Sequence, residues 1–300
     1  MVTMISLIGE QPLPNFLAIL HYQPNQVLCL YSKITKGHFD RLQSTVQNHQ
    51  HLSVSIRGID VDPYNMVNII DNLKRELYQQ KLVSQDLIFN LTGGTKIMSL
   101  AAYQVAQEWK APMLYLQSEQ KQATIMLYQW KDNEPQQIDQ QEIYSEHLTL
   151  KDILDLHLGT GAWYQNTKKR SDAGARFEQT LADLLRADGY EILQNVRSSD
   201  GQEEIDIVVR FQNRYGAIEA KCKRSTPHNI EAIKQLVTST KQLGSYVQRF
   251  YILTVPLPKE QRELVERLKI RTIILESYKD GQLATEDRQK FLSDIAQVLR

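Results

Sequence analysis

The chain has 300 residues, of which 42% are hydrophobic and 23% charged, and 35 Lys and Arg balance 35 Asp and Glu. This is the composition of an ordinary globular protein long enough for two domains, and no apolar run approaches membrane-spanning length. Only two cysteines are present, Cys29 and Cys222, and residues 1–14 carry neither a basic region nor a cleavage signal. We therefore expect a cytoplasmic protein with no membrane contact and no disulfide framework.

The first half alternates between predicted strands and helices. Apolar runs predict strands at 2–9, 26–32, 51–59, 86–92, 112–117 and 123–130, and helical spacing predicts helices at 14–22, 37–49, 62–80 and 96–110. In the third helix, Asp62 is the predicted N-cap and Pro63 the first residue. Strand–helix alternation with nearly continuous apolar strands indicates a parallel sheet covered on both faces, which is a Rossmann-like α/β domain.

The second half begins after a polar, Gln-rich segment at 131–146, which is expected to form the edge of the first domain. A short helix at 149–161 is predicted to end at Gly159. The elements expected after it are a helix at 174–189, a hairpin at 204–222, a helix at 229–244, a strand at 249–255, a helix at 258–269, a strand at 270–275 and a helix at 286–300. The predicted limits are 1–140 for the first domain, 141–171 for a linker or short helical connection, and 172–300 for the second domain.

The charge is divided unevenly between the two halves. Residues 1–167 hold 12 Lys and Arg against 16 Asp and Glu, whereas residues 168–300 hold 23 against 19. A net charge of zero argues weakly against nucleic acid as a partner of the whole chain. The excess of four positive charges in the second half permits a polyanionic substrate there without demonstrating one.

The hairpin at 204–222 carries charged residues inside its strands. Because side chains alternate along a strand, Glu219 and Lys221 share a face, and a turn at 212–216 can bring Asp206 close to them. Two neighbouring carboxylates repel and need a cation between them, and hard oxygen ligands suit Mg²⁺ or Mn²⁺. Lys221 can then position water and stabilise charge on a phosphate. The alternative is a solvated face with an exposed ion pair.

The sharpest feature of the first half is Asn-Leu-Thr-Gly-Gly-Thr-Lys at 90–96, between a buried strand and a helix. Paired glycines let the backbone approach a ligand closely. Thr95 can cap the helix, whose free N–H groups suit an anion, and Thr92 and Lys96 add a hydroxyl and a positive charge. The segment is neither a Walker A loop nor a GxGxxG motif. These residues alone leave open whether it binds a ligand or only makes a tight turn.

An Asp, a gap of about a dozen residues and Glu-X-Lys, after a helix carrying Glu178, resemble the PD-(D/E)XK nuclease superfamily over roughly residues 172–300. The motif's Pro is missing before Asp206, where Glu204 and Ile205 stand. The resemblance implies that Asp206, Glu219 and the backbone carbonyl of Ala220 are metal ligands. It also implies that Lys221 is the catalytic lysine and that Glu178 is an accessory acidic residue. A further polar residue is implied on the next helix, with Lys234, Gln235 and Lys241 as candidates.

The turn at 90–96, on a Rossmann-like domain joined to a PD-(D/E)XK domain, resembles the CARF (CRISPR-associated Rossmann fold) sensors. The chain resembles more closely the CARF nucleases known as CRISPR ancillary DNases, whose architecture spans almost its whole length. The resemblance implies a CARF sensor domain followed by a restriction-endonuclease-like α/β domain, in a homodimer whose two turns meet around a cyclic oligoadenylate. The implied ligand contacts are Thr92, Gly93, Gly94, Thr95 and Lys96, and weaker candidates in the loops after the first two strands are Gly9, Glu10, Gln11, Ser32, Lys33 and Thr35.

These expectations predict an endonuclease of type III CRISPR defence that is activated by a cyclic oligoadenylate, most often cyclic tetra-adenylate. It would use Mg²⁺ or Mn²⁺ to cleave DNA, RNA or both. Two alternatives stay open. One is a CARF-type regulator that binds nucleic acid without cutting, which usually carries a helix-turn-helix that is not predicted here. The other is a PD-(D/E)XK repair or restriction nuclease that cuts without an activator.

Overall fold

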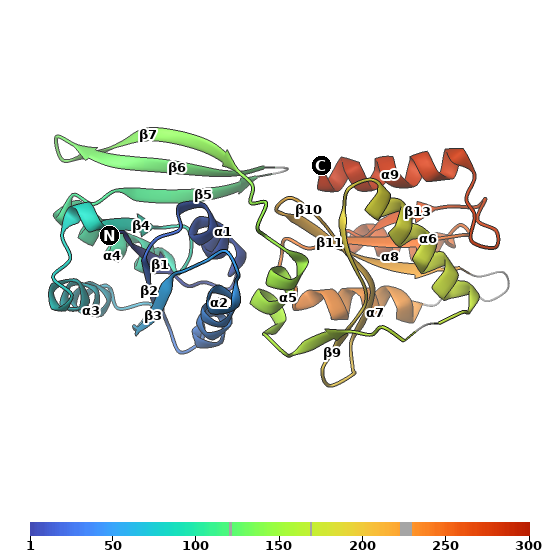
Figure 1. The fold of residues 1–300 in the computed structure, drawn as a ribbon, viewed down its shortest axis with the longest axis horizontal. Coiled ribbons are helices and arrows are strands. Elements are labelled where there is room, and N and C mark those ends of the chain that lie inside the picture. Colours follow the sequence, from blue (N-terminus) through green and yellow to red (C-terminus); the bar gives the residue numbers. More distant parts are fainter. Residues whose placement is uncertain (120–121, 169, 223–229) are drawn as a thin grey trace. The chain divides into compact units, whose positions relative to one another are not determined.

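The structure is a computed structural model that describes residues 1–300 apart from 120–121, 169 and 223–229. The chain forms two compact units, each of which contains helices and one sheet (Figure 1). Unit 1 comprises Met1–Leu148 and Asp155–Thr160, and unit 2 comprises Thr149–Leu154 and Gly161–Arg300. The limits predicted from the sequence, 1–140, 141–171 and 172–300, stay a prediction. No helix among the described residues is long and apolar enough to cross a membrane.

Unit 1 alternates between strands and helices along the chain, as the apolar pattern predicts. Its strands are β1 (Thr3–Leu7), β2 (Gln26–Tyr31), β3 (Ser55–Asp60), β4 (Leu87–Asn90), β5 (Met113–Glu119), β6 (Gln122–Lys131) and β7 (Glu134–Ile143). Its helices are α1 (Leu13–Tyr22), α2 (Lys36–Asn48), α3 (Met66–Gln79), the short 3₁₀ helix η1 (Ser84–Asp86) and α4 (Lys96–Trp109). Helix α5 (Leu150–Leu158) is divided, because its residues up to Leu154 belong to unit 2 and those from Asp155 belong to unit 1.

The sheet of unit 1 has the order β3-β2-β1-β4-β5-β6-β7, in which β1 to β5 are parallel and the last two strands antiparallel. Helices α3 and α4 pack on one face through Leu73, Leu77, Met98 and Val105, and α1 and α2 lie on the other face (Figure 1). The strand order reverses between β1 and β4. In open α/β sheets, ligands bind outside the carboxyl ends of the strands at such a reversal.

The predicted start of α3 is wrong. The helix begins at Met66, and its N-cap is Asn65, whose side chain accepts a hydrogen bond from the backbone N–H of Asn68. Asp62 closes a turn ahead of the helix, where its carboxylate accepts a hydrogen bond from Tyr64 N at 3.1 Å. An Asx side chain that closes its own turn cannot also cap the helix, so the cap moves to the next Asx residue.

The segment 131–146, predicted only as a polar domain edge, contains strand β7. This strand pairs antiparallel with β6 through the turn at Asp132 and Asn133, whose φ values are 51° and 71°. Two successive residues with positive φ form the type I′ turn that suits the twist of a hairpin, and Asp and Asn tolerate it. This Asp-Asn pair directly after a strand was the sequence signal for the hairpin.

His157 of α5 gives unit 1 a pH-dependent stability. Burial lowers its pKa to about 4, helped by the charges of Arg41 and His38 on α2. Because an unfolded His has a pKa near 6.5, the folded chain loses stability as the pH falls through 6.5 towards 4 and keeps it above 6.5. We expect His157→Gln to remove roughly 3 kcal/mol of this loss. Urea denaturation across this pH window measures it, and an unchanged pH dependence in the variant would contradict it.

Unit 2 contains a sheet of the order β13-β12-β11-β10-β9-β8. Its strands are β8 (Trp163–Gln165), β9 (Glu191–Ser198), β10 (Glu204–Phe211), β11 (Arg214–Lys221), β12 (Gln248–Leu253) and β13 (Arg271–Ile274). Its helices are α6 (Ala173–Ala187), α7 (Ile230–Lys241), α8 (Lys259–Arg267) and α9 (Thr285–Leu299). Strands β8 to β11 form an antiparallel meander, and β12 and β13 continue it in parallel.

The core of unit 2 lies between the sheet and helices α6 and α9. Phe177 and Leu181 of α6 and Phe291 of α9 pack on Ile207 and Ile218 of the two hairpin strands, while α7 lies on the opposite face (Figure 1). Helix α6 begins at Ala173, one residue before the predicted start at 174, and the side chain of its N-cap Asp172 accepts a hydrogen bond from Ala175 N. Residue 229, the predicted first residue of the next helix, lies outside the described residues.

Candidate functional site

The hairpin of β10 and β11 brings the three predicted charged residues together. The hairpin turn is shorter than the predicted 212–216, because Phe211 already pairs with Arg214. The register that aligns Ile207 with Ile218 puts Asp206 and Glu219 at the next opposed positions. The Lys221 ammonium then lies 2.5 Å from Glu219 Oε1 and 3.8 Å from Asp206 Oδ2.

Both carboxylates of the hairpin are buried. Asp206 is 7% exposed and Glu219 is 2% exposed, which excludes the alternative of a solvated face. Asp206 Oδ2 also accepts a hydrogen bond from Ala220 N at 2.9 Å, which fixes its orientation. The cation expected between the two carboxylates is, in this structure, the ammonium of Lys221.

The electrostatics of the site reflect an excess of buried carboxyl groups. Burial and the charge of Asp206 raise the pKa of Glu219 to about 7, and burial raises the pKa of Asp206. Burial lowers the pKa of Lys221, but Asp206 and Glu219 outweigh it and raise that pKa above its ordinary value. Lys221 therefore stays an ammonium at neutral pH, whereas the carboxyl groups would be stabilised as anions by a further cation.

Glu178, the predicted accessory acid, lies on α6 and is also buried. Burial and the charge of Asp206 raise its pKa to about 7, against the lowering effect of Arg170. The Arg170 guanidinium lies 3.6 Å from Glu178 Oε2. The candidates on α7 are Lys234, Gln235 and Lys241, and all three are exposed. Among the described residues, none of the three bonds to the hairpin carboxylates.

Two neighbours of the hairpin were not predicted from the sequence. Tyr251 of β12 pairs with Glu219 in the ladder and is buried, and burial and the nearby carboxylates raise its pKa to about 12 although Lys221 lowers it. Asn195 of β9 occupies the position opposite Asp206. A Tyr at alternate spacing in an apolar strand was the available signal for Tyr251. For Asn195, the available signal was the Asp200-Gly201 pair between β9 and β10, which favours a hairpin turn.

The donor set fits a divalent cation of the Mg²⁺ type. Within the described part of the chain, no group of three or more His, Cys, Asp and Glu residues is arranged to hold a metal ion. Mg²⁺, however, is commonly held by only one or two carboxylates, with waters and substrate phosphates completing its shell. Asp206 and Glu219 provide those carboxylates, and burial raises the pKa of both groups.

The glycine turn of unit 1 lies at the strand reversal between β1 and β4. A Cβ on Gly93 would lie 2.0 Å from Leu7 O, and one on Gly9 would lie 3.1 Å from Gly94 N. Gly94 has φ +73°, a left-handed conformation that glycine adopts freely. The loops after β1 and β4 therefore contact each other through the backbone of their glycines. Because glycine has no side chain, the same backbone would also let a ligand approach closely.

A buried polar network supports this turn from below. Asn90 Nδ2 donates to Ser6 Oγ at 3.2 Å and to Asn15 Oδ1 at 3.1 Å, and Asn15 Nδ2 donates to Leu7 O. On its other side, Asn90 Oδ1 accepts hydrogen bonds from the backbone N–H and the hydroxyl of Thr92. Sequence reasoning did not single out Ser6, Asn15 or Asn90; they orient the turn through hydrogen bonds.

The threonines of the turn have protein partners. Thr92 Oγ1 accepts a hydrogen bond from Leu116 N at 2.8 Å. Thr95 caps α4 as predicted, by accepting from Met98 N, and donates to Pro63 O at 2.7 Å. Lys96 is exposed at the first position of the helix. The hydroxyls thus shape the turn, and Lys96 is the residue of the turn whose side chain reaches solvent.

The loops after β1 and β2 hold the weaker candidates. Ser32 and Thr35 bond to each other, with Ser32 N donating to Thr35 Oγ1 at 2.9 Å, and so form a turn before α2. Lys33 and Glu10 are exposed, and Gln11 is partly buried. All of these residues follow the carboxyl ends of the neighbouring strands β1 and β2, at the same edge of the sheet as the glycine turn.

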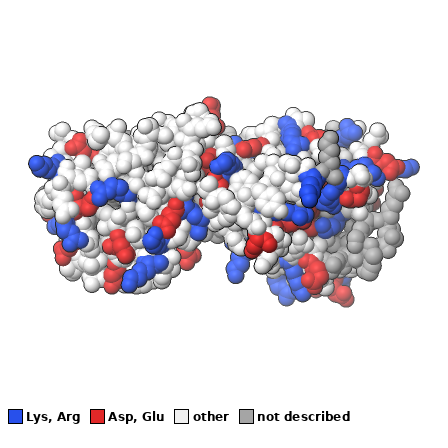
Figure 2. Space-filling model, turned by 60° about the horizontal axis from the view of Figure 1, so that its bottom comes forward, with Lys and Arg blue, Asp and Glu red and all other residues white. Residues whose placement is uncertain are grey.

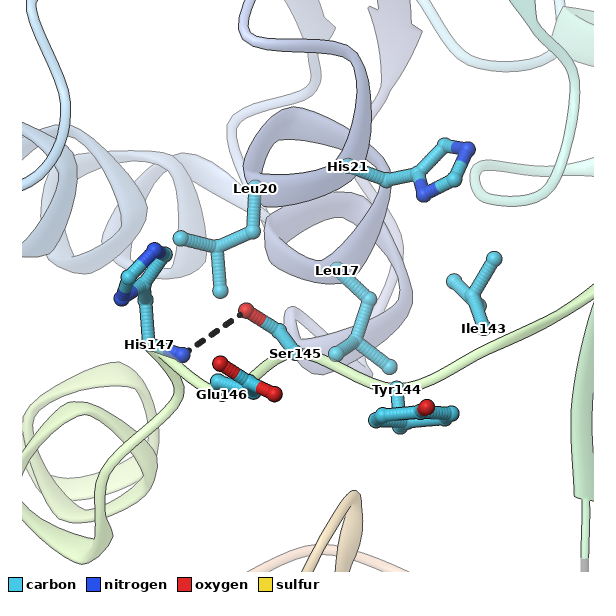
Figure 3. Close-up of a pocket in the computed structure, with 8 residues that line it drawn as sticks. All are labelled: Leu17, Leu20, His21, Ile143, Tyr144, Ser145, Glu146 and His147. Atoms are coloured by element: carbon cyan, nitrogen blue, oxygen red, sulfur yellow. Dashed lines mark hydrogen bonds between the residues drawn. The ribbon is translucent and has the colours of Figure 1, made fainter.

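A separate pocket of about 210 Å³ lies in unit 1 between α1 and the segment after β7 (Figure 3). Leu17, Leu20 and His21 project from α1 towards residues 143–147, where Ser145 Oγ accepts a hydrogen bond from His147 N at 3.2 Å. None of the residues predicted to contact a ligand lines this pocket. We therefore do not assign it as the binding site of that ligand.

The charge on the face shown in Figure 2 is mixed. Lys and Arg side chains alternate with Asp and Glu over both units on this side. The excess of basic residues in the second half does not gather there into one continuous basic patch.

Comparisons with known proteins match both halves of the chain. The family model of the Card1 CARF domain matches residues 3–152, and the restriction endonuclease family model matches residues 170–279. No curated protein matches the chain significantly. The two matches confirm the fold class predicted from the sequence, a Rossmann-like sensor-type domain followed by a restriction-endonuclease-like α/β domain.

Solved structures with the same fold cover the whole chain. Can2 from Sulfobacillus thermosulfidooxidans, in complex with cyclic tetra-adenylate, has a TM-score of 0.74 at 18% identity, with 99% of each chain covered. Protein VC1899 from Vibrio cholerae has a TM-score of 0.71 at 12% identity, with 99% of this chain and 98% of that chain covered. A type III CRISPR defence DNA nuclease activated by cyclic oligoadenylate has a TM-score of 0.59 at 15% identity, with 99% of this chain and 53% of that chain covered.

Proposed function

The chain belongs to the family of proteins with the Card1 CARF domain, and from this premise we propose that it is a nuclease activated by a cyclic oligoadenylate in type III CRISPR defence. The observation that carries the proposal is the group of Asp206, Glu219 and Lys221 on one hairpin of the restriction-endonuclease domain. Buried carboxylates can hold a divalent cation, and an adjacent ammonium group can stabilise the charge that develops on a phosphate, so the group suits metal-assisted hydrolysis of a phosphodiester.

Asp206 and Glu219, with the backbone carbonyl of Ala220, would hold Mg²⁺ or Mn²⁺. When bound, this cation would polarise the scissile phosphate as a Lewis acid. Lys221 stays protonated, because its carboxylate neighbours raise its pKa. It therefore donates hydrogen bonds to the attacked phosphate and stabilises the negative charge that develops there. Glu178 on α6 supplies a third buried carboxyl near Asp206 and tunes the charge of the site.

The glycine turn of unit 1 is the proposed sensor. Gly93 and Gly94 expose backbone N–H groups near the start of α4, where the helix dipole favours a phosphate, and Lys96 adds a positive charge. The proposed assembly is a homodimer, because two copies of one turn suit a ring such as cyclic tetra-adenylate that has matching two-fold symmetry. The ligand activates cleavage only if it binds the active arrangement more tightly than the inactive one.

Cleavage with and without activator tests this proposal. Labelled DNA and RNA are incubated with the full chain and Mg²⁺ or Mn²⁺, and cyclic oligoadenylates of different ring size are titrated. We expect cyclic tetra-adenylate to raise the cleavage rate roughly 10–100-fold through a shift in the active population. Equal rates with and without it would indicate an activator-independent repair or restriction nuclease. Binding of nucleic acid without any cleavage would indicate a regulator.

A further inference from the structure

Unit 2 contains a pocket beside the candidate catalytic residues, and most of the residues that line it have polar or charged side chains. Its volume is about 390 Å³, within the range of about 300–1,000 Å³ that is usual for small-ligand sites. Glu178 forms part of its wall, and so does Arg170, the guanidinium 3.6 Å from Glu178. The pocket therefore adjoins the proposed site of phosphodiester cleavage through a direct ion pair.

Carboxamide side chains dominate the lining of this pocket. They come from β8 and the residue after it, from α6 and from β9, and they are Gln165, Asn166, Gln179, Gln194 and Asn195. A carboxamide presents a hydrogen-bond donor beside an acceptor. Three of these groups already use one of the two within the protein, because Gln179 Nε2 donates to Asp183, Gln194 Oε1 accepts from Arg186 and Asn166 Oδ1 accepts from Lys168 N. No aromatic side chain is among the residues that line the pocket, so a planar ligand there would be selected by its hydrogen-bonding edge and not by stacking on a ring.

Asn195 shows two unfavourable features that a ligand would explain. Its φ is +53°, a left-handed conformation that is uncommon for a residue within a strand. Its Oδ1 is buried without a hydrogen-bond partner among the described residues, which is costly for a polar atom. It also occupies the ladder position opposite Asp206. Strained backbone and an unpaired polar atom next to a proposed metal ligand are typical of a functional position.

Two cations at the rim of the pocket have no carboxylate partner in the described part of the chain. They are Lys168, which is exposed, and Arg176, whose Nη1 donates to the backbone carbonyl of Ser171. Arg170 differs, because Asp172 and Glu178 both pair with it. Unpaired cations beside a group of carboxamides match the two parts of a nucleotide, its phosphate and its base.

We propose that this pocket holds one nucleotide of the substrate strand, with an adenine base on the carboxamides around Asn195 and its phosphate on Lys168 and Arg176. Asn and Gln pair with adenine through a donor and an acceptor that match its amino group and N7. This inference rests on the proposed nuclease function. It adds that the enzyme selects its cleavage position by reading a base next to the scissile phosphate.

Binding of single-stranded oligonucleotides tests the pocket without cleavage. The probes are fluorescein-labelled homopolymers of dA, dC, dG and dT, and the protein is the full chain with Glu219→Gln, in the presence of cyclic tetra-adenylate. We expect the dA probe to bind most tightly. Adding Asn195→Ala should weaken dA binding roughly tenfold and bring the four affinities together, whereas adding Lys168→Ala should weaken all four probes alike.

Two further variants keep the test decisive. Gln179→Ala replaces an exposed carboxamide of α6, so it reports on the pocket even if Asn195→Ala does not fold, and it should reduce the preference for dA in the same direction. Gln289→Ala, an exposed carboxamide of α9 outside the pocket, is the matched control and should change nothing. Equal affinity for the four probes, or a dA preference that survives both pocket substitutions, would overturn the inference.

The cleavage assay separates this inference from the proposed function. If the unsubstituted chain does not cleave with activator but binds dA in a way that depends on Asn195, the nuclease proposal fails and the nucleotide pocket stands. If the chain cleaves on activation and the pocket variants change neither affinity nor the distribution of cut positions, the nuclease proposal stands and the pocket inference fails.

Discussion

Replacing Lys221 with Ala is expected to lower activated cleavage by roughly 10²–10³-fold while binding of cyclic tetra-adenylate stays unchanged. The ammonium lies 2.5 Å from Glu219 Oε1 and 3.8 Å from Asp206 Oδ2, where it can stabilise charge on a phosphate. Lys221→Arg should restore little activity, because a planar guanidinium cannot replace a compact ammonium at this position. Initial cleavage rates at saturating activator give the effect, and calorimetric titration of the activator gives its binding.

Controls must separate lost chemistry from lost stability. Lys221 also neutralises Glu219, whose carboxylate is almost fully buried, so its removal leaves an uncompensated negative charge inside the domain. Thermal melting therefore defines the temperature at which the variants are compared as folded proteins. Lys259→Ala, on the exposed surface of α8, is the matched loss of one positive charge and should keep the full rate. An unchanged rate in Lys221→Ala would refute the assignment of this residue.

Side-chain parity was the strongest guide to the catalytic hairpin. Alternation along β11 predicts that Glu219 and Lys221 share a face, and a turn that puts Asp206 opposite Glu219 then brings it to them. The predicted turn was wrong, and this matters, because a one-residue shift in register moves a side chain to the other face of the sheet. The turn that follows Phe211 in the structure is the one that puts Asp206 opposite Glu219. The burial of both carboxylates is what distinguishes a catalytic site from a solvated face. Burial could not be predicted from the hairpin alone, because it depends on the helices that pack around it.

Other features depend on contacts that a single sequence does not contain. Asn195 lies on β9, and its place opposite Asp206 follows from the pairing of β9 with β10. The Asp200-Gly201 pair between these strands signals a hairpin turn, but sequence reasoning did not use it. For α3, the sequence offers two Asx residues, Asp62 and Asn65, and only the turn closed by Asp62 decides that Asn65 caps the helix. Strand β7 is polar along most of its length, so it lacks the apolar pattern by which the other strands of unit 1 were predicted.

The glycine turn shows the same division between local and tertiary information. Paired glycines indicate a close backbone approach, and this could be predicted. The partner in that approach could not be predicted from the turn itself, because it is the carbonyl of Leu7 on another strand. Likewise, Thr92 and Thr95 are natural candidates for ligand contacts, yet their hydroxyls bond to Leu116 N and Pro63 O. Their first role is to hold the turn in shape.

Gly93→Ala is the second substitution expected to have a large effect. Its Cβ would lie 2.0 Å from Leu7 O and 3.2 Å from Asn15 Nδ2. Leu7 cannot yield easily, because β1 is paired with β2 on one side and β4 on the other. We expect unit 1 to lose about 1–3 kcal/mol of stability as the turn shifts. If the same displacement opposes the bound geometry, affinity for cyclic tetra-adenylate should fall roughly 10–100-fold.

Gly37→Ala provides a control of opposite sign in the same unit. A Cβ there meets only Arg41 Nη1, at 3.6 Å, and the position lies in α2, where Ala is favoured over Gly by about 0.5–1 kcal/mol. Hydrogen–deuterium exchange of the β1 and β4 amides should therefore quicken in Gly93→Ala and stay unchanged or slow in Gly37→Ala, while exchange in unit 2 stays the same. Unaltered exchange and activator affinity in Gly93→Ala would mean that the turn can move away from Leu7 without loss, and the close approach of the two loops would then have no part in sensing the ligand.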